Sequence, residues 1–371
     1  MAVSRQQVLR YRLRVQQLDA TGPRAIDDVA ALDLGVQDTG PDGGRWALAN
    51  RGVEVEQLAD LGSRLALAWT LRGAPHLYRR REIAEVAAAV SPFSEADAAK
   101  RVFDAAKPLR EAGIDVSTAL DVVAGQMRDI VRSPTVKGEM STALTGRLEA
   151  PYLRYCRSCR ATHTYEQPFR LAALRAGLEL VPGTSPPVLT RIPRWTGPAE
   201  RVPAHLDVVR AYLHLLGPAT PAHVAGYLDA PVREVKQHWP DDAVEVDVDG
   251  ERRWVLDTDR PQLESGPTVP GTRLLGPFDL FLQARDRELL VPDASRRREL
   301  WVVLGRPGAV VVDGEIVGTW RPRASGRRLA VTVDAWVPPP ETAVAEQGEQ
   351  LAAVRGLTFA GVTSSGVGPT R

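Results

Sequence analysis

The sequence has few cysteines, little net charge and no long apolar run, and each shortage narrows what the chain can be. Two cysteines in 371 residues cannot build a disulfide framework, so a reduced, cytoplasmic setting is expected. No stretch is apolar enough to span a bilayer, and the first residues lack a signal-peptide core, so we expect no membrane contact. Forty-seven basic residues against 46 acidic ones give a net charge of +1. Any surface for nucleic acid must therefore come from local clusters of arginine.

The composition is that of ordinary folded domains, and the clearest pattern in it covers residues 205–256. Apolar residues at helical spacing, interrupted by Gly217-Pro218 and Pro231, predict three short helices. Alternating apolar residues on both sides of Asp249-Gly250 predict a two-stranded hairpin. Three short helices and a hairpin are the plan of a winged helix. In that plan the third helix, here about 231–238, is the one that enters a DNA major groove.

A second, looser copy of this pattern is expected over residues 116–192. Its helices are expected at 116–131, 136–148 and 169–176, and its two paired strands at 178–181 and 188–192. Strand signals then dominate residues 273–336, and a helix is expected over Glu341–Val354. The predicted fold class is α+β, with tandem winged-helix (helix-turn-helix) domains and a β-rich C-terminal part. We expect four regions. Residues 1–114 form a helical region that contains Gln37, and residues 115–197 form a winged-helix-like domain with a C-x-x-C motif. Residues 198–265 form a winged helix, and residues 266–371 form a β-rich domain with a tail.

Two features stand out in the first region. Residues 5–18 predict a basic amphipathic helix whose arginines face water, with phosphate contacts as the alternative. Residues 35–48 are rich in glycine and aspartate and predict a loop that Val36 and Trp46 anchor at its ends. Polar groups on an anchored loop often bind or catalyse, although a plain turn between helices is the alternative interpretation.

The C-x-x-C motif consists of Cys156 and Cys159, with His163 four residues further on. This spacing matches part of a structural zinc site, for which Glu166 is the local carboxylate of the right reach. A redox pair would need a thioredoxin-like βαβ context, which is missing, and an inert pair is the third interpretation. Nearby arginines would also suit phosphates: Arg154, Arg157 and Arg160.

Short motifs in a definite order run along most of the chain: Leu34-Gly35-Val36-Gln37, Arg72-Gly73-Ala74-Pro75-His76, Gly217-Pro218-Ala219-Thr220, Phe278-Asp279 with Arg285-Asp286-Arg287, and 311–320. Together these residues resemble the winged-helix DNA-binding-domain family that includes the AlkZ and YcaQ bacterial DNA glycosylases, over roughly residues 8–336. The resemblance implies tandem winged helices that form a concave channel for duplex DNA. It also implies a reaction that requires no cofactor.

Active members of the family that the chain resembles remove alkylated purines, some of them from interstrand crosslinks. They position the attacking water with a glutamine, any residue, and then glutamine or aspartate. The resemblance places Gln37 at the first of these positions and Thr39 at the third. A threonine hydroxyl is a weaker group for this task, so Asp38 is expected to be the carboxylate partner of Gln37, in a rotated loop. The family motifs and the arginine clusters together suggest DNA contacts by Arg72, His76, Arg285, Arg287 and Arg321, although a lone histidine such as His76 is more often structural.

Three functions are consistent with these features. The first is a monofunctional DNA glycosylase that hydrolyses the N-glycosidic bond of alkylated purines, for repair or for self-resistance to DNA-alkylating agents. The second is a DNA-binding or regulatory relative without catalysis, and the third is a module that binds protein or a small ligand. Near-neutral charge favours the third, whereas the resemblance favours the first two. The expected partner is double-stranded DNA, alkylated or crosslinked, bound by a monomer.

Overall fold

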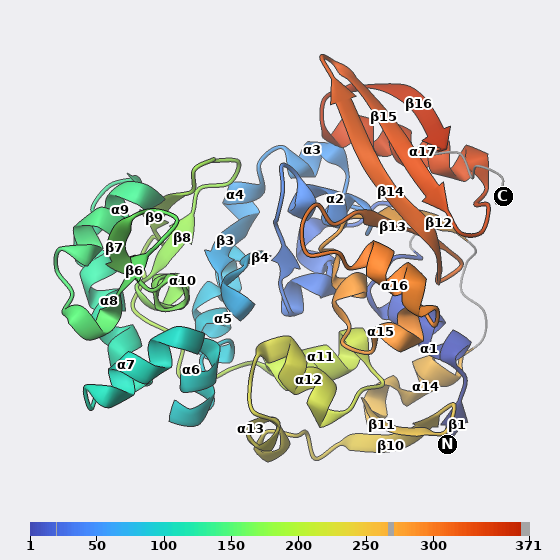
Figure 1. The fold of residues 1–371 in the computed structure, drawn as a ribbon. Helices are drawn as coiled ribbons and strands as arrows, with labels where there is room; N and C mark the ends of the chain where they lie inside the picture. Colours follow the sequence, from blue (N-terminus) through green and yellow to red (C-terminus); the bar gives the residue numbers. More distant parts are fainter. Residues whose placement is uncertain (20, 266–270, 365–371) are drawn as a thin grey trace.

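The structure, a computed structural model, describes residues 1–19, 21–265 and 271–364 and has a mixed α+β fold (Figure 1). Its strands form sheets of six, five, three and two strands. None of the described helices combines the length and the apolar character that crossing a bilayer requires. The last strand runs as far as Ser364; the end of the expected tail, residues 365–371, lies outside the described residues, as do residues 266–270 of the C-terminal region.

The N-terminal helix α1 (Arg5–Val15) begins at Ser4, whose side chain accepts from the amide of Gln7 in a capping box. The helix buries Val8, Leu9, Tyr11 and Leu13, so its apolar stripe is wider than the sequence predicts. The prediction that its arginines face water is wrong for Arg12, which is fully buried in an ion pair with Asp286. Most side chains of α1 are therefore buried, and the buried charge of Arg12 is neutralised inside the protein.

A six-stranded sheet, in the order β2-β4-β3-β8-β9-β5, forms the frame of the first half of the chain. Its strands are Val36–Gln37, Pro75–Arg79, Leu65–Trp69, Leu178–Leu180, Val188–Arg191 and Thr135–Val136. The sheet joins strands from both sides of residue 115, where a region boundary is expected. Hydrogen bonds between distant segments therefore connect the first two expected regions, and the boundary itself remains a prediction.

Helices surround this sheet on the left and in the centre of Figure 1. They are α2 (Gly43–Ala49), α3 (Val55–Leu58), α4 (Leu61–Arg64), α5 (Ile83–Ala89), α6 (Glu95–Arg101), α7 (Ala106–Glu111), α8 (Val116–Ile130), α9 (Lys137–Thr145) and α10 (Glu166–Arg175). The second predicted pattern is thus confirmed for its three helices, α8 to α10, and for the pairing of β8 with β9. The loop predicted over residues 35–48 is wrong in its second half, because α2 occupies it and Trp46 donates to the carbonyl of Leu274 at 2.5 Å.

The three short helices and the hairpin predicted over residues 205–256 are confirmed. They are α11 (Val208–Leu216), α12 (Pro221–Leu228), α13 (Val232–Gln237), β10 (Ala243–Val248) and β11 (Glu251–Leu256). Thr220 caps α12 by accepting from the amide of His223. Asp249 and Gly250 both have positive φ, as a tight two-residue hairpin requires. The first strand of the chain, β1 (Ala2–Val3), pairs in parallel with β10 and completes a three-stranded sheet.

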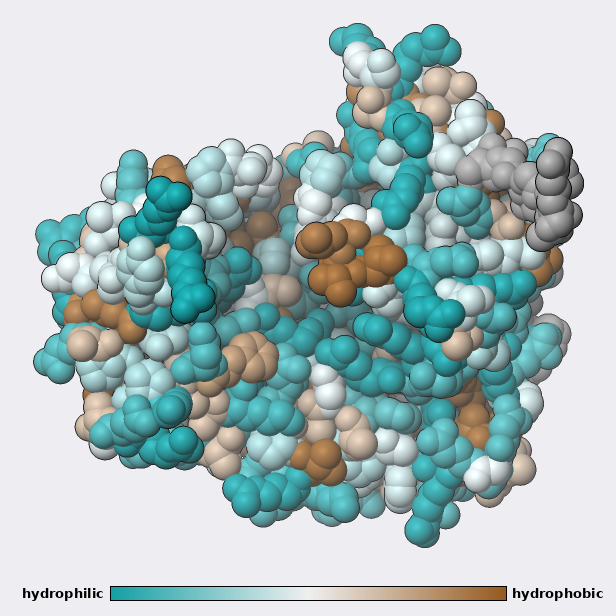
Figure 2. All heavy atoms as spheres, in the orientation of Figure 1, coloured by the Kyte–Doolittle hydropathy of each residue, from teal (hydrophilic) through white to brown (hydrophobic). Residues whose placement is uncertain are grey.

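The C-terminal part is built on a five-stranded sheet in the order β12-β13-β14-β15-β16. The strands are Thr272–Leu275, Gly308–Val312, Glu315–Ser325, Arg328–Ala335 and Thr358–Ser364, and helix α17 (Glu341–Val354) packs beside them. Short helices precede or connect these strands: α14 (Arg260–Glu264), α15 (Arg287–Leu290) and α16 (Ala294–Leu300). Figure 2 shows the surface hollowed between this part and the part that contains α8 to α10, with elements 36–79 between them.

Candidate active site and DNA surface

Gln37 lies at the end of β2, where its strand pairs with β4 and places it opposite His76. Its side chain is almost buried, with 9% of its surface exposed. The side-chain amide nitrogen of Gln37 donates to Oγ1 of Thr39 at 2.9 Å. This hydrogen bond uses one of the two amide N–H groups and orients the amide, which leaves its carbonyl oxygen as a hydrogen-bond acceptor.

Asp38 does not pair with Gln37, in contrast to the expectation from the sequence. Its carboxylate accepts from the backbone N–H of Gly44 at 2.8 Å, at the first turn of α2. Side chains alternate along an extended segment, so Gln37 and Asp38 face different cavities. Burial raises the pKa of Asp38, and the Gly44 N–H opposes that rise. The residue beside Gln37 is therefore Thr39, the one that departs from the family pattern.

The cavity that Gln37 lines has a volume of about 260 Å³ and holds four arginines. We call it the arginine cavity; its walls are Gln37, Arg72, Ala74, Phe278, Leu282, Gln283, Arg285, Arg287 and Arg306. Within the described residues, none of these four guanidinium groups lies within 4.0 Å of a carboxylate oxygen. Burial, and then the charge of neighbouring arginines, lowers the pKa of Arg285, Arg287 and Arg306. Uncompensated positive charge in a polar cavity indicates a site for an anion.

Arg72 is held rigidly at this wall. Its guanidinium donates to the carbonyl of Tyr227 at 2.6 Å and to Oε1 of Gln283 at 2.7 Å, and lies 4.4 Å from the ring centroid of Tyr227. The turn that presents it has positive φ at Arg72 and at Gly73. Gly73 has a φ of +70°, a conformation that residues with side chains rarely adopt, which explains the glycine in this motif.

His76 was expected as a DNA contact, but its side chain is completely buried. Nδ1 is 3.0 Å from Oγ1 of Thr70 and from the carbonyl oxygen of Ala74, and Nε2 has no partner among the described residues. Burial first, and then the charge of Arg72, lowers the pKa of His76 to about 3. In this conformation the His76 side chain lies in the protein interior, on the strand that pairs with the strand of Gln37, and its expected DNA contact stays a prediction.

The structure thus brings together Gln37 and three of the expected DNA contacts, Arg72, Arg285 and Arg287. Arg321, the fifth expected contact, lies outside the arginine cavity and donates to the carbonyl of Gly305 at 2.6 Å. Sequence reasoning missed Arg306 as a wall of the cavity, because it stands in a short loop with no periodic pattern. Its neighbours Gly305 and Pro307 mark a turn, and that was the available signal.

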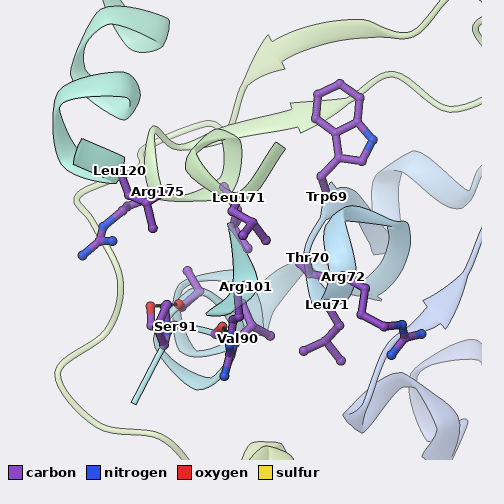
Figure 3. A pocket seen from close by; sticks show the side chains of 13 residues that line it. Trp69, Thr70, Leu71, Arg72, Val90, Ser91, Arg101, Leu120, Leu171 and Arg175 are labelled. Carbon is purple, nitrogen blue, oxygen red and sulfur yellow. Dashed lines mark hydrogen bonds between the residues drawn. The ribbon is translucent and has the colours of Figure 1, made fainter. Parts of the chain in front are cut away.

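A second, smaller cavity of about 40 Å³ lies behind β3 and is drawn in Figure 3. Two of the three arginines that line it are neutralised: Arg101 pairs with Asp97 at 2.6 Å and Arg175 with Asp121 at 2.7 Å. In Figure 3 the guanidinium of Arg72 points away from the labelled leucines of this cavity. A neutralised, mainly apolar gap of this size is a packing feature rather than a site for a charged substrate.

The three predicted metal ligands, Cys156, Cys159 and His163, do meet. Cys156 ends β6 (Leu153–Cys156), Cys159 lies in the turn, and His163 is on β7 (Ala161–Thr164). Their sulfur and nitrogen atoms all lie within 4.8 Å of one another. Glu166, the expected fourth ligand, is instead bonded to Lys137 at 2.7 Å and to Arg170 at 2.6 Å.

Comparison with known proteins places this mixed α+β fold in a class of DNA-glycosylase-like proteins. The chain belongs to the family described as DNA glycosylase AlkZ-like, whose model matches residues 16–354. It is similar to the interstrand DNA cross-link repair glycosylase of Streptomyces sahachiroi, with 26% identity over 352 aligned positions, in an alignment that covers 86% of this chain and 88% of that protein. The solved structure of the Streptomyces sahachiroi DNA glycosylase AlkZ has the same fold, with a TM-score of 0.75 and 22% identity over 98% of this chain and 100% of that one.

Proposed function

We propose that this chain is a monofunctional DNA glycosylase that hydrolyses the N-glycosidic bond of alkylated purines in duplex DNA. The observation that carries the proposal is the position of Gln37, fixed by Thr39 at the wall of a cavity with four unneutralised arginines. A glutamine can orient water, and arginines can hold the phosphates on either side of the damaged nucleotide.

The reaction follows from these positions. The carbonyl oxygen of Gln37 accepts a hydrogen bond from a water molecule and directs its oxygen towards C1′ of the deoxyribose. The bond between C1′ and the purine nitrogen breaks, and its electron pair leaves with the base, which neutralises the positive charge of the alkylated ring. The water oxygen bonds to C1′ and its proton passes to solvent, since an amide is too weak a base to keep it. DNA phosphates held by the arginines supply negative charge beside the cationic sugar.

Thr39 acts in this scheme as a positioning residue. The family pattern that the chain resembles has glutamine or aspartate there, which could contact the water directly. The Thr39 hydroxyl instead accepts from the amide nitrogen of Gln37. An alkylated purine leaves easily because it already carries positive charge, so one well-oriented water suffices.

Residues 208–256 supply a winged helix in this proposal, and the looser unit from 116 to 191 supplies a second. In the first unit α13 would enter the major groove, and its exposed residues Arg233, Lys236 and Gln237 fit contacts with phosphates and base edges. The four regions expected from the sequence are retained here as functional parts of a monomer, because the arginine cavity takes residues from the first and the last of them.

The test is incubation of a duplex that carries N7-alkylguanine with the protein, followed by measurement of alkali-labile abasic sites. We expect Gln37→Ala to lower the rate by roughly 10²–10⁴-fold, the usual contribution of one catalytic group. Thr39→Val keeps the shape of the side chain but removes the acceptor, so we expect an intermediate loss. The matched control Asp38→Asn should stay close to wild type, because an asparagine oxygen can still accept from Gly44.

The same assay separates the competing functions. Loss of activity in Asp38→Asn with full folding would restore Asp38 as the carboxylate partner of Gln37. Wild-type protein that binds the duplex but forms no abasic sites would be a non-catalytic DNA-binding relative. Because the similar Streptomyces protein is named for interstrand cross-link repair, a duplex crosslinked through purine N7 atoms belongs in the substrate panel.

Excision as proposed uses no metal. Separately, we propose that Cys156, Cys159 and His163 bind one zinc ion that fastens the β6–β7 hairpin. Tetrahedral zinc with Zn–S bonds of about 2.3 Å needs ligand atoms a few ångströms apart, and these three atoms meet that requirement. Since Glu166 is engaged by Lys137 and Arg170, the fourth position falls to solvent.

A further inference from the structure

Two neighbouring apolar side chains project into solvent more fully than any other large hydrophobic residue among those the structure describes. Val303 is 92% exposed and Leu304 is 88% exposed, whereas the next, Tyr155, is 64% exposed. Leaving two such side chains in water is unfavourable by the apolar area that they keep hydrated. An exposed apolar pair in a folded protein is therefore a sign of a contact made with another molecule.

The loop that carries this pair is firmly held at its base. Trp301, just before the loop, is buried and donates to the carbonyl of Leu282 at 3.2 Å. Arg321 donates to the carbonyl of Gly305 at 2.6 Å, and the guanidinium of Arg306 lies 5.1 Å from the ring centroid of Phe278. The tip is thus presented by anchored residues on both sides, and two arginines stand below it.

The base of the loop is also part of the candidate active site. Arg306, two residues after Leu304, lines the arginine cavity together with Gln37. Figure 2 shows a hydrophobic patch beside the hollow in the surface, where Figure 1 draws the loop between α16 and β13. An apolar tip therefore stands next to a cavity that is suited to phosphates.

We propose that Val303 and Leu304 form a wedge that inserts between stacked bases of the bound duplex beside the damaged nucleotide. The inference rests on the proposed function, because it takes DNA as the molecule in the hollow. Aliphatic side chains that enter a base step replace stacking contacts and open the duplex, while arginines next to them hold the flanking phosphates. This arrangement would expose C1′ of the damaged nucleotide to the water that Gln37 orients.

The chemistry of the loop favours DNA over other occupants. A protein partner of ordinary size would cover a far larger apolar area than two side chains offer. A membrane surface would be met by an extended apolar and basic face, whereas this tip rises beside a recessed polar cavity. In a single base step, the two apolar side chains would contact the bases and the two arginines would contact the flanking phosphates.

The test uses an undamaged duplex with 2-aminopurine, whose fluorescence rises when it loses stacking, so no excision is involved. Wild-type protein should raise the fluorescence on binding. The double variant Val303→Ser/Leu304→Ser should lose most of this rise and bind the duplex roughly tenfold more weakly, with the same salt dependence because no charge is removed. The conservative variant Val303→Ile/Leu304→Met should keep the rise. Val337→Ser, at a half-exposed valine outside the loop, is the matched control.

The outcomes separate the wedge from the proposed function. If the serine variant unstacks the duplex as well as wild type does, the wedge is refuted. If wild-type protein binds DNA and forms abasic sites without any fluorescence rise, the wedge is refuted and the glycosylase proposal stands. If wild-type protein neither binds the duplex nor forms abasic sites, both proposals fail, and binding of anionic vesicles that depends on Leu304 would point to a membrane instead.

Discussion

Arg12 and Asp286 form a two-pronged ion pair inside the protein, with nitrogen–oxygen distances of 3.0 and 2.7 Å. Arg253 also donates to the Asp286 carboxylate. Burial alone would raise the pKa of Asp286, but the charges of Arg12 and Arg253 outweigh it and the pKa is lowered. Because Asp286 stands between Arg285 and Arg287, the pair fixes the segment that supplies two walls of the arginine cavity.

Replacing Arg12 should therefore destabilise the whole fold. In Arg12→Met the apolar stem remains while the charge is lost, which leaves Asp286 buried with Arg253 as its remaining ionic partner. We expect the free energy of unfolding to fall by about 3–5 kcal/mol, as for other broken buried ion pairs. Urea denaturation of wild type and variant measures this change in the free energy of unfolding. Arg10→Met on the same helix should change it by less than about 0.5 kcal/mol, and equal effects of the two variants would contradict the assigned role.

Acid should reveal the burial of His76. Its folded-state pKa is lowered to about 3, below the value near 6.5 of an unfolded chain. Between these pKa values the unfolded state binds a proton at His76 and the folded state does not. The contribution of His76 to the free energy of unfolding is therefore fully present above about pH 6.5 and is lost as the pH falls towards 3. Between these limits it contributes a slope of at most about 1.4 kcal/mol per pH unit.

Glutamine cannot titrate, so comparing the pH dependence of unfolding in wild type and His76→Gln separates the contribution of His76 from that of the carboxyl groups. The difference in unfolding free energy between wild type and variant should narrow as the pH falls from 6.5. His205→Gln, at an exposed histidine, provides the control. A difference that does not change with pH would show that His76 has the same pKa in the folded and the unfolded protein, and would reopen a direct role in DNA binding.

The arginine cavity predicts a defined salt dependence. Each phosphate contact contributes about 0.9 to the slope of log affinity against log salt concentration. Arg285→Ala/Arg287→Ala should lower the slope by up to about 1.8 and weaken all duplexes alike. Lys107→Ala/Arg110→Ala removes the same charge from exposed positions on α7 and should change the slope less. Binding that ignores salt in the wild type would argue for a partner other than nucleic acid.

The zinc proposal predicts metal in protein that is purified without added zinc. Metal analysis should find about one equivalent in wild type and His205→Ala, and none in Cys159→Ser or His163→Ala. Cobalt added to the metal-free protein should produce thiolate-to-metal charge-transfer absorption, and metal should protect both cysteines from alkylation. Absence of this absorption together with unprotected thiols would leave the pair inert, and a disulfide in fully oxidised protein without metal would favour redox chemistry.

Local signals in the sequence predicted local structure well. The Asp249-Gly250 hairpin and the helix Glu341–Val354 follow from turn chemistry and periodicity, which act within a few residues. The buried pair of Arg12 with Asp286 could not be predicted, because its members are 274 positions apart and each alone is typical of a surface residue. The contact of Gln37 with Thr39 could not be predicted for a related reason: strand alternation, set by the pairing of β2 with β4, decides which side chain faces Gln37.

The same separation of 274 residues sets an order for synthesis of the chain. A ribosome that adds 5–20 residues each second needs roughly a quarter of a minute to one minute to travel from residue 12 to residue 286. Throughout that time α1 exists without the carboxylate that neutralises its buried guanidinium, and without the loop that will carry Val303 and Leu304. The ion pair of α1 therefore forms only after residue 286 has left the ribosome, so a nascent chain of this protein stays open to chaperones at least until then.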